Sequence, residues 1–333
     1  MKLVIDAFGG DNAPEAVIEG VCRAMREWGD FDVILTGEEQ RIRQELEKRD
    51  ADMNRISIID APEIITCDEQ PTVAIKRKKN SSIVAAMNVM AAGEADCFIS
   101  AGSTGAVLTG ATLIVRRIPG VKRPALAPLL PTAGKPFLLL DCGANSDCKP
   151  EYLQQFAIMG AAYMKGVMGI EDPAVCLVNN GAEAAKGSEL SKAAYALLSE
   201  TEVNFKGNCE AREIFSGKYD VVVTDGFTGN VIIKEAEGLA ETLFRMLKRE
   251  LRSSFKTKLG ALMAKPAFKT VKKTMDYTEY GGAPLLGING GIIKAHGSSD
   301  AKAFVSAIRQ ARKYVSGGVT EKIAAGISSS AEE

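Results

Sequence analysis

Short apolar runs alternate with longer amphipathic stretches along most of the chain. Each short run ends in an acidic, amide, glycine or hydroxyl residue, as a buried strand does where it meets a loop. The runs that we predict as strands are 3–6, 31–37, 55–60, 97–100, 136–141, 174–179 and 221–225. The predicted helices cover 14–28, 38–49, 82–92, 151–168 and 188–199, with others after residue 104 and from about residue 230. This alternation predicts an α/β fold with three layers, in which helices cover both faces of a mostly parallel sheet.

Polar and glycine-rich segments follow several of the predicted strands. In an open parallel sheet, ligands bind beside the loops at the carboxyl ends of the strands, so these segments are the candidates for chemistry. They read "DAFGGDNAP" from residue 6, "SAGSTGA" from residue 100, "DCGANSDCKP" from residue 141, "NNGAEAAKG" from residue 179 and "TDGFTGN" from residue 224. We expect them to lie along one edge of the sheet.

The segment "SAGSTGA" suits a small anion. Glycine permits close approach of backbone amides, and Ser and Thr add hydroxyl donors near the positive end of the following helix. We therefore predict that Gly102, Ser103, Thr104 and Gly105 bind phosphate. A tight turn that needs glycine for packing would explain the same residues. The sequence contains neither GxGxxG nor GxxxxGKS/T, which disfavours a nucleotide as the ligand.

The segments after residues 179 and 224 carry a lysine and an amide. Lys186 would place a point charge near a phosphate or a developing negative charge, although most lysines are solvated surface residues. Asn230 would donate to a carbonyl oxygen that becomes an oxyanion. Asp225 or Thr228 would cap the helix that starts here, and we assign Asp225 a positioning role.

The single histidine and the first loop complete the candidate site. His296 lies in "IIKAHGSSD", where a loop histidine could act as a general acid or base, although a lone histidine is more often structural. Asp6 and Asp11 would repel a phosphate, so we assign them a positioning role. Either Asp11 or Asn12 is expected to cap the helix near residue 14.

Two basic stretches are candidates for contact with an acidic protein or an anionic membrane. The first is 76–79, and the second runs from 245 to 273, where apolar residues recur at helical spacing until Pro266 interrupts the pattern. A dimer helix with a basic solvent face explains the second stretch equally well. Nucleic acid is a weaker alternative because the stretch has few aromatic residues. The residues that we assign to these contacts are Lys76, Arg77, Lys78, Lys79, Arg252, Lys256, Lys258, Leu259 and Leu262.

Composition narrows the class of protein further. The chain has 333 residues and a formal net charge of −1, so its bulk charge indicates neither a nucleic acid nor a membrane partner. Seven cysteines without a CxxC pair, together with one histidine, predict reduced thiols in a cytosolic protein and no zinc site. We expect no metal and no organic cofactor. The uncharged stretch 97–115 is predicted as strand, loop and helix, because its glycine and hydroxyl residues make it too weakly apolar for a membrane span.

Taken together, these motifs resemble one family. The matching text runs in order from residue 4 to about residue 300 and includes "VIDAFGGDNAP", "RKKNSS", "ISAGSTGA", "LLLDCGAN", "AAKGSEL", "VVTDGFTGN", "EYGGAPLLG" and "IKAHGSSD". The sequence resembles the bacterial phosphate acyltransferases, which convert acyl-acyl carrier protein and inorganic phosphate to acyl phosphate for phospholipid synthesis. Phe8, Asn12 and Ser103 depart from the family, which usually has Met, His and Asn at these positions.

The resemblance implies a fold, partners and a location. The fold would be like that of isocitrate dehydrogenase and related to phosphate acetyltransferase. The protein would be a cytosolic homodimer that binds acyl carrier protein, attaches peripherally to an anionic membrane and delivers its product to a membrane glycerol-phosphate acyltransferase. We expect one catalytic domain over 1–325, with a projecting helical segment at about 239–275 and a frayed tail over 326–333.

The chemistry of that family suits the loops. Phosphate dianion is already a competent nucleophile, so the reaction needs a cradle beside the thioester and donors for the oxyanion. The loop at 102–105 would hold phosphate, Lys186 would neutralise charge and Asn230 would donate to the oxyanion. His296 would orient phosphate or protonate the leaving thiolate.

Other functions stay open at this point. A phosphate acetyltransferase-like or butyryltransferase-like enzyme would take the acyl group from acyl-CoA. A hydride-transfer enzyme of the same broad fold would need a nucleotide site and usually clustered acids for a metal, and the sequence shows neither pattern. A non-catalytic adaptor for a membrane or a carrier protein would need only the basic helix.

Overall fold

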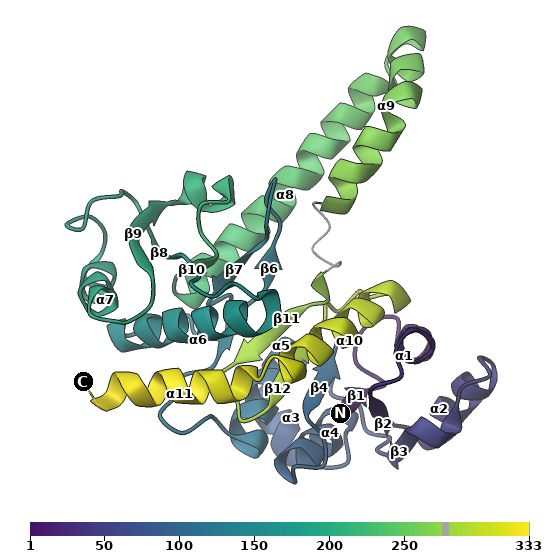
Figure 1. The fold of residues 1–333 in the computed structure, drawn as a ribbon. Helices are drawn as coiled ribbons and strands as arrows, with labels where there is room; N and C mark the ends of the chain where they lie inside the picture. Colours follow the sequence, from purple (N-terminus) through teal and green to yellow (C-terminus); the bar gives the residue numbers. More distant parts are fainter. Residues whose placement is uncertain (275–279, 333) are drawn as a thin grey trace.

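The chain folds into two sheets flanked by helices, and a helical hairpin projects from the second of them (Figure 1). The computed structural model describes residues 1–274 and 280–332. Both sheets are mostly parallel and carry helices on their faces, which confirms the predicted α/β class. The division into two sheets differs from the one sheet that the sequence suggested.

The first sheet has β1 near its middle, and the strand next to one edge runs antiparallel to both of its neighbours. Its order is β3 (Ile56–Asp60), β2 (Asp32–Gly37), β1 (Lys2–Asp6), β4 (Cys97–Ser100), β12 (Gly291–Lys294), β11 (Ala283–Leu286) and β5 (Ala125–Leu126). Neighbours from β3 to β12 are parallel, so these strands end at the same edge. Leu3 and Ile5 face one apolar core and Val4 faces another, because successive side chains of a strand alternate between the faces.

The second sheet is smaller, and its strands are also mostly parallel. Its order is β6 (Leu129–Leu130), β7 (Phe137–Leu140), β10 (Val221–Val223), β8 (Val175–Asn179) and β9 (Phe205–Glu210). Only β6 is antiparallel to its neighbour. The segment 125–130 links the sheets, because Leu126 pairs with Leu285 in the first sheet and Leu129 pairs with Leu138 in the second.

Helices cover both sheets and close the core between them. They are α1 (Glu15–Glu27), α2 (Glu39–Glu47), α3 (Pro71–Arg77), α4 (Ser82–Ala91), α5 (Thr104–Gly110), α6 (Pro150–Met168), α7 (Glu189–Ser199), α8 (Gly226–Leu251), α9 (Phe255–Thr274), α10 (Ala301–Ser316) and α11 (Val319–Glu332). Short 3-10 helices cover Met53–Arg55 and Ala211–Ser216, and a π-helical turn covers Ala111–Val115. Helix α1 packs closely on α10, where a Cβ at Gly20 would lie only 2.4 Å from the Cβ of Phe304.

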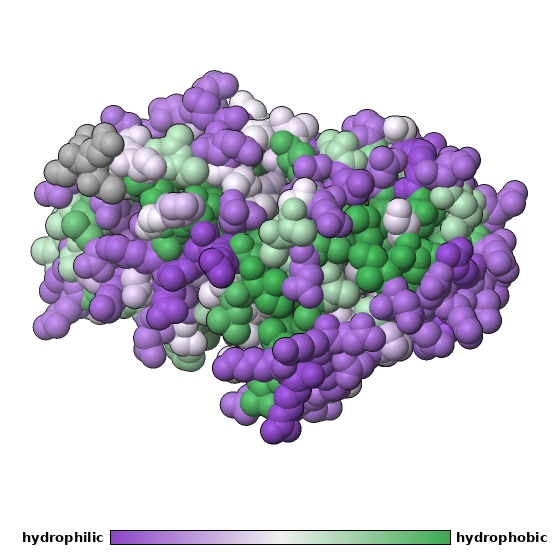
Figure 2. Space-filling model, turned by 90° about the horizontal axis from the view of Figure 1, so that it is seen from below, coloured by the Kyte–Doolittle hydropathy of each residue, from purple (hydrophilic) through white to green (hydrophobic). Residues whose placement is uncertain are grey.

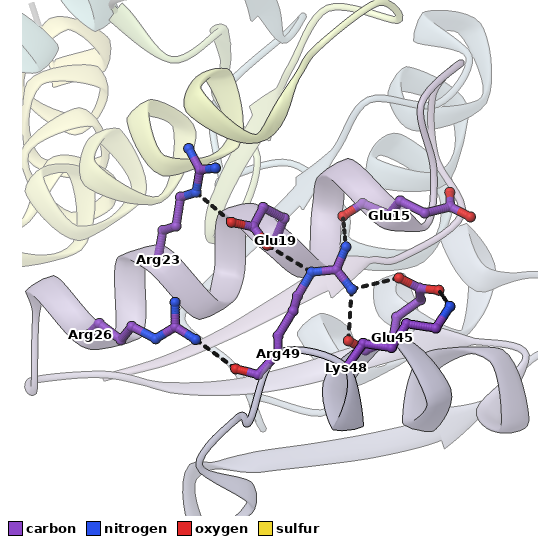
Figure 3. A network of polar contacts seen from close by, with 7 residues as sticks. All are labelled: Glu15, Glu19, Arg23, Arg26, Glu45, Lys48 and Arg49. Carbon is purple, nitrogen blue, oxygen red and sulfur yellow. Dashed lines mark hydrogen bonds and ion pairs between the residues drawn. The ribbon is translucent and has the colours of Figure 1, made fainter.

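An ion-pair network fastens α1 to α2 at the outer side of the first sheet (Figure 3). Arg49 Nε lies 2.8 Å from Glu19 Oε2, and Arg49 Nη1 lies 2.5 Å from Glu45 Oε2. Arg26 donates to the carbonyl oxygen of Arg49. Hydrogen bonds from Arg23 and Arg49 lower the pKa of Glu19, and those from Lys48 and Arg49 lower the pKa of Glu45, so the network is charged at neutral pH.

The carboxyl-terminal segment is helical rather than frayed. Helix α11 includes 326–332 of the expected tail, and Ile327 is buried beside Ile118 and Ile323. A Cβ at Gly326 would lie 2.8 Å from Ile158 of α6, so the two helices touch here. Burial of this apolar face explains the difference, because "GISSSAEE" looks polar only when it is read without its packing partner.

The projecting hairpin breaks at a different place from the one that the sequence suggested. Helices α8 and α9 are separated at residues 252–254, whereas Pro266 lies inside α9. Ser254 and Thr257 cap α9 reciprocally, because each side-chain oxygen accepts from the other residue's amide at 3.2 and 3.1 Å. Local capping therefore ends one helix and starts the next where the apolar pattern runs on without interruption.

Apolar surface is not confined to the hairpin. The face that lies opposite it, seen from below in Figure 2, shows apolar areas (green) between hydrophilic residues (purple). Outside the hairpin, exposed large apolar residues include Leu113 and Ile64. Exposure alone therefore does not identify a partner surface.

The uncharged stretch 97–115 folds as predicted, into β4, a loop, α5 and the π-helical turn. Within residues 1–274 and 280–332, no helix combines the length and the apolar character needed to cross a bilayer.

Candidate active site

Loops from β1 and β12 are fastened to each other at the carboxyl edge of the first sheet. The amide of Asp11 donates to Gly297 O at 2.8 Å, and Asn12 Nδ2 donates to Ser298 O at 3.1 Å. Gly10 has a φ of 99°, and a Cβ there would lie 2.8 Å from Gly297 O. The expected cap by Asp11 or Asn12 is wrong, because α1 starts after Pro14 with no side-chain cap and Asn12 holds the β12 loop instead.

A buried hydrogen-bond chain shapes the predicted phosphate loop. Ser100 Oγ donates to Asp6 Oδ2 at 2.7 Å and accepts from the amide of Gly102 at 2.9 Å. The other oxygen of Asp6 accepts from the amide of Phe8 at 3.2 Å. Burial raises the pKa of Asp6, and the hydrogen bonds from Ser82 and Ser100 oppose that rise. Asp6 thus positions the loop and does not face a ligand directly.

The residues 102–105 divide into packing and donor positions. The sequence suggested that Gly102 binds phosphate. In the structure, its amide donates to Ser100 Oγ instead. A Cβ at Gly105 would lie 2.5 Å from Pro71 Cγ, which explains this glycine by packing against α3. Ser103 Oγ accepts from the amide of Ala106 at 3.5 Å, as the cap of α5, and the side chain of Thr104 is exposed.

His296 stands on the turn that follows β12. Its Nδ1 accepts from the amide of Ser298 at 3.2 Å and lies 2.8 Å from Ser298 Oγ. Because an amide can only donate, the neutral ring carries its proton on Nε2. The residue is exposed, so an Nε2–H group at this edge could reach a bound substrate.

In the second sheet, Asp141 organises the loop that follows β7. Its carboxylate accepts from the amides of Leu126, Ala144 and Asn145 at 3.0, 3.2 and 2.6 Å, and from Asn145 Nδ2 at 2.9 Å. Burial raises the pKa of Asp141, while these donors oppose the rise. The carboxylate thereby ties the loop to the segment that crosses from the first sheet.

The start of α8 packs against this loop. Asp225 caps the helix, accepting from the amide and hydroxyl of Thr228 at 2.8 and 2.7 Å. A Cβ at Gly229 would lie 1.9 Å from Asp141 O, so only glycine permits this approach. Asn230 follows with an exposed side chain, and its Cβ would lie 3.9 Å from a Cβ at Gly143.

Lys186 is exposed on the loop after β8, the strand beside β10. Its amide donates to Glu183 O and its carbonyl accepts from Asn179 Nδ2, both at 3.1 Å. These contacts are made within its own loop. Lys186 therefore shares the edge of the second sheet with Asn230, while His296 and Thr104 lie at the edge of the first.

The two edges meet at a small hollow that the sequence did not indicate. It is lined by Thr104, Val107, Leu108, Leu126, Ala144, Leu285 and Lys294. Lys294 lies in the segment "IIKAHGSSD", but the sequence did not predict it as a site residue. The sequence feature that could have indicated Lys294 is a lysine at the end of an apolar strand, because an unpaired charge is costly at such a position.

The basic residues 76–79 differ from one another. Lys78 Nζ lies 2.7 Å from Glu69 Oε1 and donates to Ile64 O, so it fastens a loop. Lys76, Arg77 and Lys79 are exposed and accessible to a partner. On the hairpin, Arg252, Lys256, Lys258, Leu259 and Leu262 are all exposed.

Glycine-rich loops, hydroxyl groups and a buried lysine lie where the edges of two mostly parallel sheets meet, and they mark the candidate site of an α/β protein. The family described as "Fatty acid synthesis protein" matches residues 1–322, and the chain belongs to this family. A relative from Clostridium novyi named phosphate acyltransferase is 50% identical over 323 residues, which cover 97% of each chain. Another of that name, from Clostridium botulinum, is 52% identical over 94% of this chain and 93% of its own. These relatives confirm the resemblance drawn from the motifs.

Solved structures show the same fold at low sequence identity. A phosphotransacetylase from Streptococcus pyogenes aligns with a TM-score of 0.65 and 17% identity, over 96% of this chain and 94% of its own. The EutD phosphotransacetylase from Staphylococcus aureus aligns with a TM-score of 0.60 and 16% identity, over 97% and 94%. The expected relation to the phosphate acetyltransferase fold is thus confirmed.

Proposed function

We propose that this protein transfers a fatty acyl group from acyl carrier protein to inorganic phosphate, giving acyl phosphate for phospholipid synthesis. The observation that carries the proposal is the near full-length match, at about half identity, to relatives named phosphate acyltransferase. The geometry supports it, because hydroxyl, amide, imidazole and ammonium groups lie along the two meeting sheet edges.

In the reaction that we propose, a phosphate oxygen attacks the thioester carbonyl carbon and forms a C–O bond, and the tetrahedral oxyanion that results collapses as the C–S bond breaks. Ser103 and Thr104 would hold the phosphate, since the amide of Gly102 is bonded elsewhere. Asn230 would donate to the tetrahedral oxyanion, and Lys186 would neutralise the growing negative charge. His296 would orient the phosphate through its Nε2–H, or protonate the leaving thiolate as the imidazolium and then recover the proton of the hydrogenphosphate, which gives the carrier thiol.

The surfaces away from the site suit the partners of such an enzyme. We propose that the apolar stripe of the hairpin forms a homodimer contact, and that its basic tip meets an anionic membrane where a glycerol-phosphate acyltransferase takes the product. The stripe includes Leu239, Leu243, Met246 and Leu247, each at least 40% exposed, and the tip includes Arg252, Lys256, Lys258, Leu259 and Leu262. Lys76, Arg77 and Lys79 would receive the acidic carrier protein.

The test is acyl-thioester turnover with and without inorganic phosphate, with the acyl phosphate trapped by hydroxylamine. Acyl carrier protein and coenzyme A serve as donors in parallel arms. We expect hydroxamate only when phosphate is present, and a higher kcat/KM with the carrier protein. Turnover without phosphate dependence would contradict the reaction, and a preference for acyl-CoA would contradict the donor.

The membrane proposal is tested by co-sedimentation with vesicles. We expect binding to vesicles that contain phosphatidylglycerol, and weaker binding after Leu259→Ser and Leu262→Ser. Equal binding to neutral vesicles would contradict a basic tip that recognises anionic lipid.

A further inference from the structure

Lys294 is a charged residue at a core position. It ends β12, in register with Ser100 of β4, and is only 8% exposed. The preceding residues of this strand, Ile292 and Ile293, are fully buried and face the cores on either side of the sheet. An ammonium group at such a depth loses most of its hydration, which costs far more free energy than burying an aliphatic side chain.

The surroundings of Lys294 do not compensate for this cost. Its Nζ has three N–H donors, and the acceptor that it contacts is the carbonyl oxygen of Ala295. Among residues 1–274 and 280–332, no carboxylate lies within ion-pair distance of Nζ. Cys67, Asp6 and Asp11 act on it only from beyond that distance, and Asp6 is bonded to Ser100 and Phe8.

The position of Lys294 relates it to the site. The hollow that it lines also contains Thr104 of the predicted phosphate loop and Ala144 of the loop after β7. Its remaining lining is aliphatic, so the stem of Lys294 lies in apolar surroundings. Coulombic attraction is strongest in such surroundings, and one cation contributes more than it would on the surface.

Burial lowers the pKa of Lys294 to about 8, from an ordinary value of 10.5. The group is therefore still mostly protonated at neutral pH. An arriving dianion would favour the protonated form further, since opposite charges stabilise each other.

We propose that Lys294 binds the phosphate substrate, with Nζ donating to one phosphate oxygen while the Thr104 hydroxyl donates to another. This inference rests on the proposed function, because it names the cation that holds the substrate of that reaction. It differs from the role given to Lys186, which is exposed and lies at the edge of the other sheet. The phosphate would then provide the counter-charge that the folded chain lacks around Nζ.

The experiment compares wild type with Lys294→Met, Lys294→Arg and Lys2→Met. Lys2 starts β1 at the opposite edge of the same sheet, so it is a matched control for loss of one lysine. Steady-state kinetics with acyl carrier protein as donor give the KM for phosphate and the KM for the donor. We expect Lys294→Met to raise the KM for phosphate about 10-fold to 100-fold, the value of a charge-assisted hydrogen bond. Lys294→Arg should recover part of this loss, and Lys2→Met should behave as wild type.

Thermal unfolding with inorganic phosphate alone separates binding from a structural role. Without phosphate, Lys294→Met should have a Tm equal to or above that of wild type, because it removes a buried charge. Phosphate should raise the Tm of wild type and leave that of Lys294→Met unchanged. A variant that unfolds more easily, or fails to fold, while Lys294→Arg keeps the wild-type KM for phosphate would show that the lysine is structural.

The outcomes distinguish this inference from the proposed function. If wild type shows phosphate-dependent turnover and Lys294→Met keeps its KM for phosphate, the inference on Lys294 is wrong and the function stands. If wild type shows no phosphate-dependent turnover, the proposed function is wrong. If Lys294→Met changes only the KM for the acyl donor, the lysine acts on the donor and the phosphate assignment fails.

Discussion

Each sheet has a buried aspartate at the end of one strand, but the two carboxylates act differently. Asp6 reaches the phosphate loop through the hydroxyl of Ser100, and it also accepts from the side chain of Ser82 and from one amide, that of Phe8. Asp141 accepts directly from three amides and from Asn145 Nδ2. Both have a pKa raised by burial. The comparison teaches that the number and kind of donors, more than burial, decide how much a buried carboxylate supports its loop.

The largest expected effect is that of Asp141→Asn. Both carboxylate oxygens of Asp141 accept from N–H groups, and an asparagine has only one oxygen. Its NH2 group would therefore face the N–H groups of the loop. We expect the free energy of unfolding to fall by about 3 kcal/mol, as when a buried charge-assisted network is broken. Urea denaturation monitored by circular dichroism measures this. A loss no greater than that of Asp6→Asn would break the comparison.

A pH effect sharpens the contrast, because the edge that holds Asp6 also holds Lys294. Since the pKa of Lys294 is about 8 when folded and 10.5 ordinarily, the unfolded chain binds the proton more tightly between these values. The stability of the fold with a neutral Lys294 is therefore fully present above pH 10.5. It is lost as pH falls through 8, because the unfolded chain takes up the proton first. Cys67, Asp6 and Asp11, which lie beyond ion-pair distance, are the charged or titratable groups that raise its pKa against the effect of burial.

The measurement is the free energy of unfolding of wild type and Lys294→Met, without phosphate, from pH 7 to 10.5. The difference between the two proteins should change by about 2 to 3 kcal/mol in favour of wild type as pH rises. Taking the difference cancels the titration of the other groups. A difference that stays constant with pH would contradict the assignment.

Asp6→Asn should cost less than the same substitution at Asp141. An asparagine can still accept from the amide of Phe8, and its NH2 group can donate to Ser100 Oγ. The Ser100 hydroxyl hydrogen is then available for another acceptor. We expect a loss of about 1 kcal/mol or less, together with a measurable rise in the KM for phosphate as the Gly102 turn shifts. Urea denaturation and steady-state kinetics measure the two effects. A loss of stability equal to that of Asp141→Asn would show that burial outweighs donor number.

The smallest effects are expected at Ser103, the departure from the family. Ser103→Ala removes the cap of α5 and should cost about 0.5 to 1 kcal/mol, whereas Ser103→Asn keeps an acceptor and should be nearly neutral. Thermal unfolding measures the stabilities, and the KM for phosphate tests contact with the substrate. If Ser103→Ala raised that KM tenfold without loss of stability, the hydroxyl would be a ligand rather than a cap.

Much of the fold could be predicted because strands and helices in this chain have clear periods. The runs 97–100 and 174–179 became β4 and β8 with nearly the predicted ends. The division into two sheets could not be predicted, because it depends on which strands pair across the segment 125–130. The short strands β5, β6, β11 and β12 were not predicted either. Their sequences are brief and lie close to glycine or proline residues.

The candidate site was predicted in part. The glycine-rich loops lie at the strand ends as expected, because glycine and hydroxyl residues mark such turns directly in sequence. What each residue contacts was not visible: Gly105 meets Pro71, the amide of Gly102 is bonded to Ser100, and Lys78 is paired with Glu69. Lys294 escaped notice because its burial depends on both sheets. The exposure of a lysine is a property of the fold and not of its neighbours in sequence.

The crossing segment has a mechanical consequence for the site. Leu126 pairs with Leu285 of the first sheet, while its amide donates to Asp141 Oδ1 and its carbonyl accepts from the amide of Cys142. One residue, Leu126, therefore bonds to both sheets and sets the spacing between the two groups of loops. Any motion that spread the sheets apart would have to break these bonds together. The loops of the two sheets are thus tied to each other through the backbone, and not only through the side chains that border the site.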